Sequence, residues 1–419
     1  MLIIFLVLVI SCKQNPGGNN SLQEVGSANI NKLLKLTPTP PMGWNSWNWH
    51  GKKNINERVV LETIDAMVST GLKAAGYQYV VIDGGWRDSI LGENGELKWN
   101  TTKFPNGIKY LADYAHSKGL KLGVHVVPGS HDCGRDNVGG FGHEETHVKQ
   151  FVEWGLDFIK LDLCTHKFDP CSDCNKYNYG WAEESIAPTY KKWQNLLENC
   201  GRDIVLSISA YQFRDWYPET CNMARTTGDI EARIHKGAFF HTDTIEHTFF
   251  SVLDIAEINN ASADQAGNGY WNDPDMLVTG AHGLNEKEQV THFNLWCIMS
   301  APLFIGSDPR VMTDFEQNLL TNQELLTVNQ DPTEQGRLIK RDGVSQIWHK
   351  KLRNGESALL FLGLKRRRFK NININLKEIG FDKNAKVKDI TNNKHIELKS
   401  DYLSFDLLKN ESVMVIVSK

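Results

Sequence analysis

Between residues 38 and 331 the sequence repeats one pattern, in which a short apolar run is followed by a stretch with helical spacing of its apolar residues. The runs are Met42–Asn45, Tyr79–Asp83, Leu122–Val127, Phe158–Asp162, Ile204–Ser209, Met223–Thr227, Asp275–Val278 and Leu303–Gly306. Strands that alternate with helices form a parallel sheet, because each helix returns the chain to the start of the next strand. Eight repeats over roughly 290 residues predict an α/β fold, the (β/α)8 or TIM barrel.

The helical stretches between these runs have recognisable ends. Four of them are Asn56–Ala75 before Gly76, Ile108–Ser117 before Gly119, His143–Trp154 before Gly155, and Glu286–Ser300 before Pro302. Glycine just beyond a helix ends it because it adopts the left-handed conformation, and proline cannot continue one. The positions of these residues therefore support the alternation of strands and helices.

Beyond the alternating region the pattern changes to one typical of antiparallel sheets. Apolar and polar residues alternate in Ser345–His349, Ala358–Leu362, Ile372–Leu376 and Ser412–Val417, and Asn, Gly and Asp lie between these runs. Period-two alternation with turn residues predicts a small β-sandwich. We therefore expect a (β/α)8 barrel over 38–333, as the part that holds any active site, and a C-terminal antiparallel β-sandwich over 334–419.

The composition excludes several classes of protein. The chain has 419 residues, of which 41% are apolar and 23% charged, a balance typical of globular proteins and not of disordered or fibrous ones. The formal net charge is -4, from 46 basic and 50 acidic residues, so no basic excess favours nucleic acid. Twelve tryptophans are more than a core needs, and their rings suit stacking against ligands.

The N-terminus resembles an export signal. Leu2–Ile10 is continuously apolar but shorter than the ~20 residues that span a bilayer. The run ends in Val9-Ile10-Ser11-Cys12, which resembles a bacterial lipobox within residues 1–12, and the polar segment 13–37 reads as a flexible tether. We expect an exported bacterial lipoprotein, attached to a membrane only through a lipid on Cys12. A plain cleaved signal peptide is the alternative.

Carboxylates recur where the predicted strands end. They are Asp83, Asp162, Asp229, Asp273 and Asp275. Any single one could simply cap a loop, but at matching positions of one barrel they would meet at one mouth, where burying several carboxylates requires cations. Lys160 lies two residues before Asp162 and so on the same strand face, and Arg225 lies four residues before Asp229. An ion pair without a ligand is the alternative for Lys160 and Asp162.

Tryptophans follow the same strands. Trp44 and Trp47 follow the first, Trp86 follows the second, and Trp271 lies beside the seventh. Packing at the barrel rim is one interpretation. Paired carboxylates with tryptophan surfaces are also the residues that cleave glycosidic bonds, where one carboxylate attacks the sugar and the other moves the proton.

These segments resemble glycoside hydrolase family 27, the clan of α-galactosidases and α-N-acetylgalactosaminidases. The matching motifs are Pro40–Trp47 (PPMGWNSW), Phe104–Lys109 (FPNGIK), Lys160–Cys164 (KLDLC), Arg225–Ile230 (RTTGDI), Trp271–Leu277 (WNDPDML), Ala301–Gly306 (APLFIG) and Val328–Pro332 (VNQDP). The resemblance covers about residues 38–340 and implies a retaining exo-α-glycosidase that acts on an oligosaccharide or polysaccharide without a cofactor or metal.

The resemblance also implies roles for individual residues. Asp162 matches the family's nucleophile and Asp229 its acid/base, which retention requires to lie ~5–5.5 Å apart. The family's other sugar-binding positions are matched by Trp44, Asp83, Lys160, Arg225 and Asp275.

The chain departs from the family at the residues that select the sugar. Asp83-Gly84-Gly85-Trp86 stands where the family has Asp-Asp-Cys-Trp, so the second carboxylate that binds the 4- and 6-hydroxyls is missing. His125 replaces a tyrosine, and Ala210 stands where a glutamate would bind the 2-hydroxyl. A site that loses hydroxyl-binding carboxylates is expected to change substrate. We expect Trp86, His125 and Ala210 at a site for an α-galactoside, a modified galactose, another hexose or a pentopyranose.

Cysteines and histidines allow several further interpretations. The resemblance implies a Cys133–Cys164 disulfide and the loss of a second one, because Ser209 stands at the partner position of Cys221. The group Cys164, His166, Cys171 and Cys174 could bind zinc, although a Cys171–Cys174 bond, or one from either of these to Cys200, is favoured in an exported chain. His131 and His143 flank a glycine-rich loop. Packing within this loop is one interpretation of the two side chains. The other is that His131 lines the pocket together with His125.

Two other functions remain open from the residues alone. The scaffold could bind glycans without hydrolysing them, because two carboxylates that select the sugar are missing, although both catalytic aspartates are present. A transglycosylase would use the same residues and differ only in its acceptor.

Overall fold

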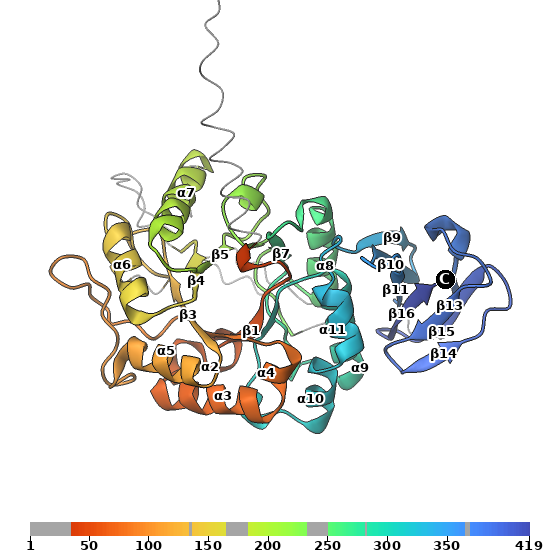
Figure 1. Cartoon of the computed structure of the whole chain (residues 1–419), viewed down its shortest axis with the longest axis horizontal. Helices are drawn as coiled ribbons and strands as arrows, with labels where there is room; N and C mark the ends of the chain where they lie inside the picture. Colours follow the sequence, from red (N-terminus) through yellow and green to blue (C-terminus); the bar gives the residue numbers. More distant parts are fainter. Residues whose placement is uncertain (1–34, 134–135, 165–182, 233–249, 281–282, 365–368) are drawn as a thin grey trace, which may run out of the picture.

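A parallel eight-stranded sheet forms the larger part of the protein. The computed structural model describes residues 35–133, 136–164, 183–232, 250–280, 283–364 and 369–419. The strands are β1 (Met42–Asn45), β2 (Tyr79–Ile82), β3 (Lys121–Val126), β4 (Phe158–Asp162), β5 (Val205–Ser209), β6 (Met223–Arg225), β7 (Trp271–Asp273) and β8 (Leu303–Ile305). Their order is β7-β6-β5-β4-β3-β2-β1-β8, with parallel neighbours and helices outside (Figure 1). The predicted barrel is confirmed.

The seventh strand does not lie where the sequence predicts it. We expect Asp275–Val278, whereas the structure has β7 at Trp271–Asp273. The reason is the backbone of Asp275, whose φ of 82° lies in the left-handed region and ends the extended chain. The apolar residues beyond it join the sheet through one bridge, in which Leu277 N donates to Phe304 O at 2.7 Å and Gly306 N to Leu277 O at 2.9 Å. This bridge closes the seam between β7 and β8.

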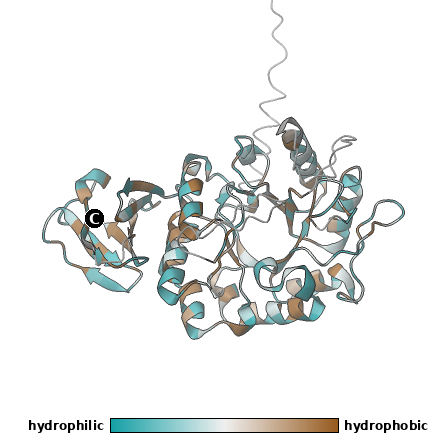
Figure 2. Cartoon of the chain, turned by 180° about the vertical axis from the view of Figure 1, so that it is seen from behind, coloured by the Kyte–Doolittle hydropathy of each residue, from teal (hydrophilic) through white to brown (hydrophobic). Residues whose placement is uncertain are grey.

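Helices surround the sheet close to their predicted limits. They are α2 (Trp47–Asn54), α3 (Glu57–Ser69), α4 (Leu72–Ala75), α5 (Gly107–Ser117), α6 (Glu144–Trp154), α7 (Glu183–Asn199), α8 (Val252–Asn260), α9 (Glu286–Ile298), α10 (Asp314–Leu320) and α11 (Gln323–Gln330). Gly76 and Gly155 end α4 and α6 in the left-handed conformation, as predicted. The helix expected over 56–75 is divided at Gly71, which also has a positive φ. The helices carry hydrophilic and hydrophobic residues side by side (Figure 2).

Aromatic side chains fill the barrel where the strands begin. Tyr79, Phe158 and Phe304 meet with ring centroids 5.3–6.4 Å apart. Trp271 belongs to the same buried cluster, and its indole N–H donates to Thr37 O at 2.9 Å. The described side chains therefore fill the barrel at this end, and the ligand site of such a barrel is expected at the opposite end, where the strands finish.

The C-terminal part consists of two antiparallel sheets. One has the order β14-β13-β16-β11-β10-β9 and the other pairs β12 with β15. Their limits are β9 (Arg337–Arg341), β10 (Ser345–Lys351), β11 (Ser357–Gly363), β12 (Phe369–Asn375), β13 (Lys386–Asp389), β14 (Lys394–Ile396), β15 (Tyr402–Leu407) and β16 (Ser412–Ser418). Ile347, Phe361, Ile374 and Leu403 form a core between the two sheets. The predicted sandwich is confirmed.

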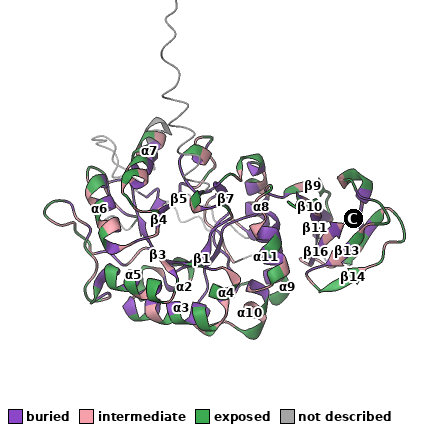
Figure 3. Ribbon diagram, viewed as in Figure 1, coloured by how far each residue is buried: buried purple, intermediate pink, exposed green. Residues whose placement is uncertain are grey.

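The sandwich packs on the barrel through α9. Thr291 Oγ1 donates to Asn410 O at 2.8 Å, and Asn294 Nδ2 donates to Ser412 Oγ at 3.0 Å. Lys350 of β10 is buried, and its ammonium donates to Ser300 Oγ at 2.5 Å, to Val328 O at 2.5 Å and to Asp331 O at 2.8 Å. Buried residues run through the strands of both parts (Figure 3), and one hydrophobic cluster spans them.

The predicted signal, lipobox and most of the tether fall on residues 1–34, which lie outside the described residues. Among the helices of the described residues, none has the length and apolar character needed to cross a membrane.

Candidate active site

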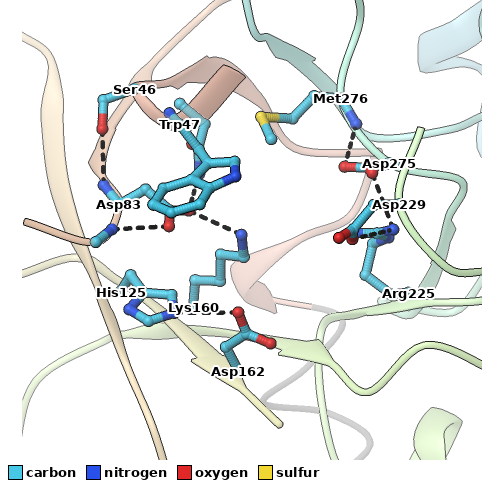
Figure 4. Close-up of polar contacts among 12 residues, drawn as sticks. Ser46, Trp47, Asp83, His125, Lys160, Asp162, Arg225, Asp229, Asp275 and Met276 are labelled. Carbon is cyan, nitrogen blue, oxygen red and sulfur yellow. Dashed lines mark hydrogen bonds and ion pairs between the residues drawn. The ribbon is translucent and has the colours of Figure 1, made fainter. Parts of the chain in front are cut away.

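A cavity of about 280 Å³ opens where β1–β7 end. Eighteen residues line it: Trp47, Asn48, Lys52, Asp83, Gly84, Arg87, His125, Asp132, Cys133, Lys160, Asp162, Ser209, Tyr211, Arg225, Asp229, Ile230, Asp275 and Met276. Seven of the expected site residues, all with titratable side chains, are among them: Asp83, His125, Lys160, Asp162, Arg225, Asp229 and Asp275. Figure 4 shows how these side chains surround one space.

On one side of the pocket, Asp83 and Lys160 form a buried ion pair. Lys160 Nζ lies 2.8 Å from Asp83 Oδ2, and the same oxygen accepts a hydrogen bond from Asn45 Nδ2 at 2.9 Å. Gly84 N donates to Asp83 Oδ1 at 2.8 Å. Burial raises the pKa of Asp83, but Lys160, His125 and Asn45 outweigh it and hold that pKa well below the usual range. Asp83 is therefore an ionised acceptor whose position is fixed.

Asp162, the predicted nucleophile, ends β4 at the floor of the pocket. His125 Nε2 lies 3.1 Å from its Oδ2, and Tyr211 Oη donates to its Oδ1 at 2.9 Å. Burial raises the pKa of Asp162, but the hydrogen bond from His125 and the charge of Lys160 bring it below the usual value. The carboxylate is therefore ionised at neutral pH, as a nucleophile must be.

Across the pocket, Arg225 holds two carboxylates. Its Nη2 lies 3.2 Å from Asp229 Oδ1 and 2.9 Å from Asp275 Oδ2. Asp275 also accepts hydrogen bonds from Ile230 N at 2.9 Å and Met276 N at 2.7 Å. Burial raises the pKa of Asp275, Arg225 opposes the rise, and the neighbouring carboxylates add to it. Asp229 differs from the other carboxylates because 40% of its side chain is exposed, as suits a group that exchanges protons with water.

Three residues expected to bind the sugar do not line the pocket. The side chains of Trp44 and Trp86 are fully buried, with indole N–H groups that donate to Ser307 O at 2.8 Å and His125 O at 2.9 Å. Ala210 is 2% exposed and belongs to the main hydrophobic core cluster, whereas its neighbours Ser209 and Tyr211 line the pocket. The sequence predicts Trp271 at the mouth of the barrel. This prediction is wrong, because Trp271 packs with Tyr79, Phe158 and Phe304 where the strands begin.

Two lining residues were missing from the predicted sugar-binding set. Trp47 is 44% exposed, and a Cβ on Gly84 would lie 3.1 Å from its Cζ3. The indole therefore lies against Gly84, where the family has its second carboxylate. Tyr211 follows Ala210 with a φ of 62°. Trp47 ends the PPMGWNSW motif, which is a signal for its position near the pocket, but nothing in the sequence signals the backbone turn that brings Tyr211 to Asp162.

The implied Cys133–Cys164 disulfide is present, with a Cα–Cα distance of 4.8 Å, and it joins the loops that follow β3 and β4. Among the described residues Cys200, Cys221 and Cys297 are free, which agrees with the expected loss of the Cys221 bond. The favoured bonds of Cys171 and Cys174, to each other or to Cys200, involve residues outside the described part of the chain and stay predictions. His166, Cys171 and Cys174, the other candidate zinc ligands, lie outside the described residues.

One cluster in the described part of the chain has the spacing of a metal site: ligand atoms of His125, Asp162 and Cys164 lie within 4.8 Å of one another. Cys164 is in the disulfide and has no thiolate to offer, so these residues do not fit a metal ion. His131 is not among the lining residues and is hydrogen-bonded to Ser130, while His143 stacks on His147.

Comparison with known proteins gives a consistent result. Residues 39–331 match the family model described as alpha galactosidase A. An α-galactosidase of Cyamopsis tetragonoloba is 37% identical over 373 residues, which is 86% of this chain and 82% of the relative. The structure of α-galactosidase I from Mortierella vinacea superposes with a TM-score of 0.82 at 27% identity, covering 90% of this chain and 96% of that one. The structure of a family 27 β-L-arabinopyranosidase from Geobacillus stearothermophilus superposes with a TM-score of 0.77 at 25% identity. The match covers 92% of this chain and 98% of that one.

Proposed function

The chain belongs to glycoside hydrolase family 27, the α-galactosidase family, and from this membership we propose that it is a retaining exo-α-glycosidase with Asp162 as nucleophile and Asp229 as acid/base. One observation carries the proposal. Both carboxylates face a single pocket with different surroundings: Asp162 is buried and held ionised by donors, whereas Asp229 is partly exposed and touches one guanidinium. Two carboxyls with different environments suit two roles.

In the first half-reaction, an Asp162 oxygen attacks the anomeric carbon of the terminal sugar. The bond from that carbon to the leaving oxygen breaks, and the leaving oxygen takes the proton of Asp229. The sugar is now joined to Asp162 as an ester. Asp83 accepts a hydrogen bond from a sugar hydroxyl, and the exposed ring of Trp47 offers a surface for the sugar's C–H face.

In the second half-reaction, the Asp229 carboxylate takes a proton from water while the water oxygen attacks the anomeric carbon. The ester bond to Asp162 breaks, the Asp162 carboxylate is regenerated, and Asp229 is again protonated. Two displacements at one carbon leave its configuration unchanged.

The substrate we propose is a terminal α-galactoside or a sugar derived from it. Trp47 lies against Gly84 where a second carboxylate would bind hydroxyls, so the pocket presents an indole edge to that part of the sugar. This favours a sugar that lacks or modifies the 6-hydroxyl, and a family 27 neighbour acts on a β-L-arabinopyranoside. A panel of aryl α-D-galactoside, α-D-N-acetylgalactosaminide, α-D-glucoside and β-L-arabinopyranoside decides among these.

The test of the mechanism uses the best substrate from that panel. Asp162→Ala should lower kcat/KM by about 10⁴-fold or more, because no covalent intermediate forms. Added azide should restore turnover to this variant and give a product of inverted configuration, since azide replaces the missing carboxylate. Asp229→Ala should retain activity only on substrates whose leaving group needs no proton. Full activity in Asp162→Ala, or inverted configuration in the first product of the wild type, would contradict the assignment.

Two alternatives are outcomes of the same experiments. Binding of galactosides in calorimetry without turnover of any substrate in the panel would favour a glycan-binding protein. Transfer of the sugar to an added alcohol or saccharide in preference to water would favour a transglycosylase.

We also propose that the chain is an exported lipoprotein, on the apolar run Leu2–Ile10 and the lipobox-like residues that end at Cys12. The full-length protein expressed in a bacterium should incorporate labelled palmitate and partition into detergent. Cys12→Ala should do neither, and labelling of this variant would contradict the proposal.

A further inference from the structure

We infer that His125 and Tyr211 act as a donor pair on Asp162 that sets the balance between the two half-reactions. The inference rests on the proposed role of Asp162 as nucleophile. His125 and Tyr211 are positioning residues in this account, because they act through the carboxylate and not on the sugar.

The two donors reach Asp162 from both neighbouring parts of the sheet. His125 lies on β3, where it pairs in register with Lys160 of β4, and Tyr211 follows β5, whose Ser209 pairs with Asp162. Each carboxylate oxygen accepts from a different residue, at 3.1 Å from His125 and 2.9 Å from Tyr211. An ionised carboxylate can only accept, so Nε2 of His125 carries the proton that points at Asp162.

The loop after β5 is built to hold Tyr211 in an unusual conformation. Its φ of 62° is uncommon for a large side chain and persists only where the surroundings enforce it. Arg214 Nη1 donates to Ala210 O at 2.8 Å, and Tyr217 Oη donates to Gln212 O at 3.0 Å, so the residues on both sides of Tyr211 are tied down. Held in this conformation, Tyr211 places its hydroxyl 2.9 Å from Asp162 Oδ1.

The charged groups around Asp162 are already committed to other partners. Lys160 lies 2.8 Å from Asp83, and Arg225 bonds to Asp275 and Asp229. The hydrogen bonds that touch the Asp162 oxygens therefore come from the imidazole and the phenol. Their strength changes with the charge on those oxygens as the reaction proceeds.

This dependence on charge acts in opposite directions on the two half-reactions. Hydrogen bonds to an ionised carboxylate are stronger than those to an ester. When Asp162 attacks, its negative charge is lost and both bonds weaken, so the donor pair slows formation of the covalent intermediate. When the ester bond breaks, the charge returns and both bonds strengthen, so the donor pair speeds release of the sugar. Without it the intermediate should form readily and accumulate.

The experiment compares Tyr211→Phe with the wild type on a 2,4-dinitrophenyl glycoside of the sugar chosen by the panel. This leaving group departs easily, so that breakdown of the intermediate limits kcat. We expect kcat to fall about tenfold and KM to fall with it, because a hydrogen bond to a charged group is lost from the second step. The value of kcat/KM, which reports the first step, should rise, because the lost hydrogen bond no longer opposes the attack of Asp162. Rapid mixing should show a burst of dinitrophenol, and the intact protein should carry the mass of one sugar.

His125→Phe removes the donor on the other oxygen and should show the same split, which gives a second route if one variant is unstable. Tyr77→Phe is the matched control, since it removes the hydroxyl of a buried phenol that donates to Leu320 O at 3.0 Å, and neither residue lines the pocket. It should leave kcat and KM unchanged.

Equal losses of kcat and kcat/KM in both variants, or no change in either constant, would overturn the inference while leaving Asp162 as the nucleophile. Failure of the proposed function appears separately, as retained activity in Asp162→Ala.

Discussion

Replacing Lys160 with methionine should destabilise the protein strongly, because it leaves Asp83 charged, buried and without its cation. The two groups lie 2.8 Å apart, and their side chains are 14% and 4% exposed. Removing one partner of a buried ion pair costs about 3–5 kcal/mol of unfolding free energy, most of it from the stranded charge. Methionine keeps the length of the lysine stem, so the loss of packing is small.

A second substitution separates the stranded charge from other effects. In Asp83→Asn/Lys160→Met both charges are gone, and the asparagine carbonyl can still accept the hydrogen bond from Gly84 N. Its amide faces the Asn45 amide, which at present donates to Asp83 at 2.9 Å, so a residual cost of about 1–2 kcal/mol is expected. The double variant should therefore be more stable than Lys160→Met by about 2–3 kcal/mol.

The assay is urea unfolding of the wild type, both single variants and the double variant at neutral pH. The difference between the double variant and the sum of the singles gives the coupling free energy of the pair. If the two single effects simply add, so that the double variant is the least stable of the four, the ion pair is not what holds Asp83 in the pocket and the reasoning fails.

Three further predictions concern stability. The Cys133–Cys164 disulfide links residues 31 positions apart, so Cys133→Ser/Cys164→Ser should lose about 3–4 kcal/mol of unfolding free energy. Reduction should lower the Tm of the wild type and leave the Tm of the double variant unchanged. Lys350→Met leaves Ser300, Val328 and Asp331 without their donor and should cost about 2–4 kcal/mol in denaturant, against less than 0.5 kcal/mol for the exposed Lys109→Met. The folded-state pKa values of Asp83 and Asp162 lie below the usual one, so the stability that these carboxylates contribute should be present above about pH 4 and be lost as the pH falls further. The free energy of unfolding should therefore differ less between pH 3 and pH 5 in Asp83→Asn than in the wild type.

Much of the barrel could be predicted because its strands are buried apolar runs and its helices end at glycine. The seventh strand was the exception. Trp271–Asp273 is mostly polar and does not read as a strand, whereas Met276–Val278 is apolar and does. The difference arises at Asp275, whose left-handed backbone is fixed by hydrogen bonds from distant parts of the chain. Local patterns cannot report such bonds.

The site was predictable to a different extent for charged and aromatic residues. The aspartates, Lys160 and Arg225 meet as expected, because a parallel barrel brings the ends of its strands together. Trp44 and Trp86 follow strands in the same way but turn into the wall, and Trp47 faces the pocket. The direction of a side chain beyond a strand depends on backbone angles and on neighbours such as Gly84. Neither can be predicted from the position of the residue after a strand.

Helix α9 has a consequence for how the molecule comes apart. Nine of its residues are buried, from Gln289 to Ile298, including polar ones such as His292 and Asn294. Beyond its exposed first turn, the helix is covered by the barrel on one side and by the sandwich on the other. Barrel and sandwich should therefore melt in a single cooperative transition, and a chain cut after residue 333 would expose this surface and aggregate instead of leaving a working catalytic domain.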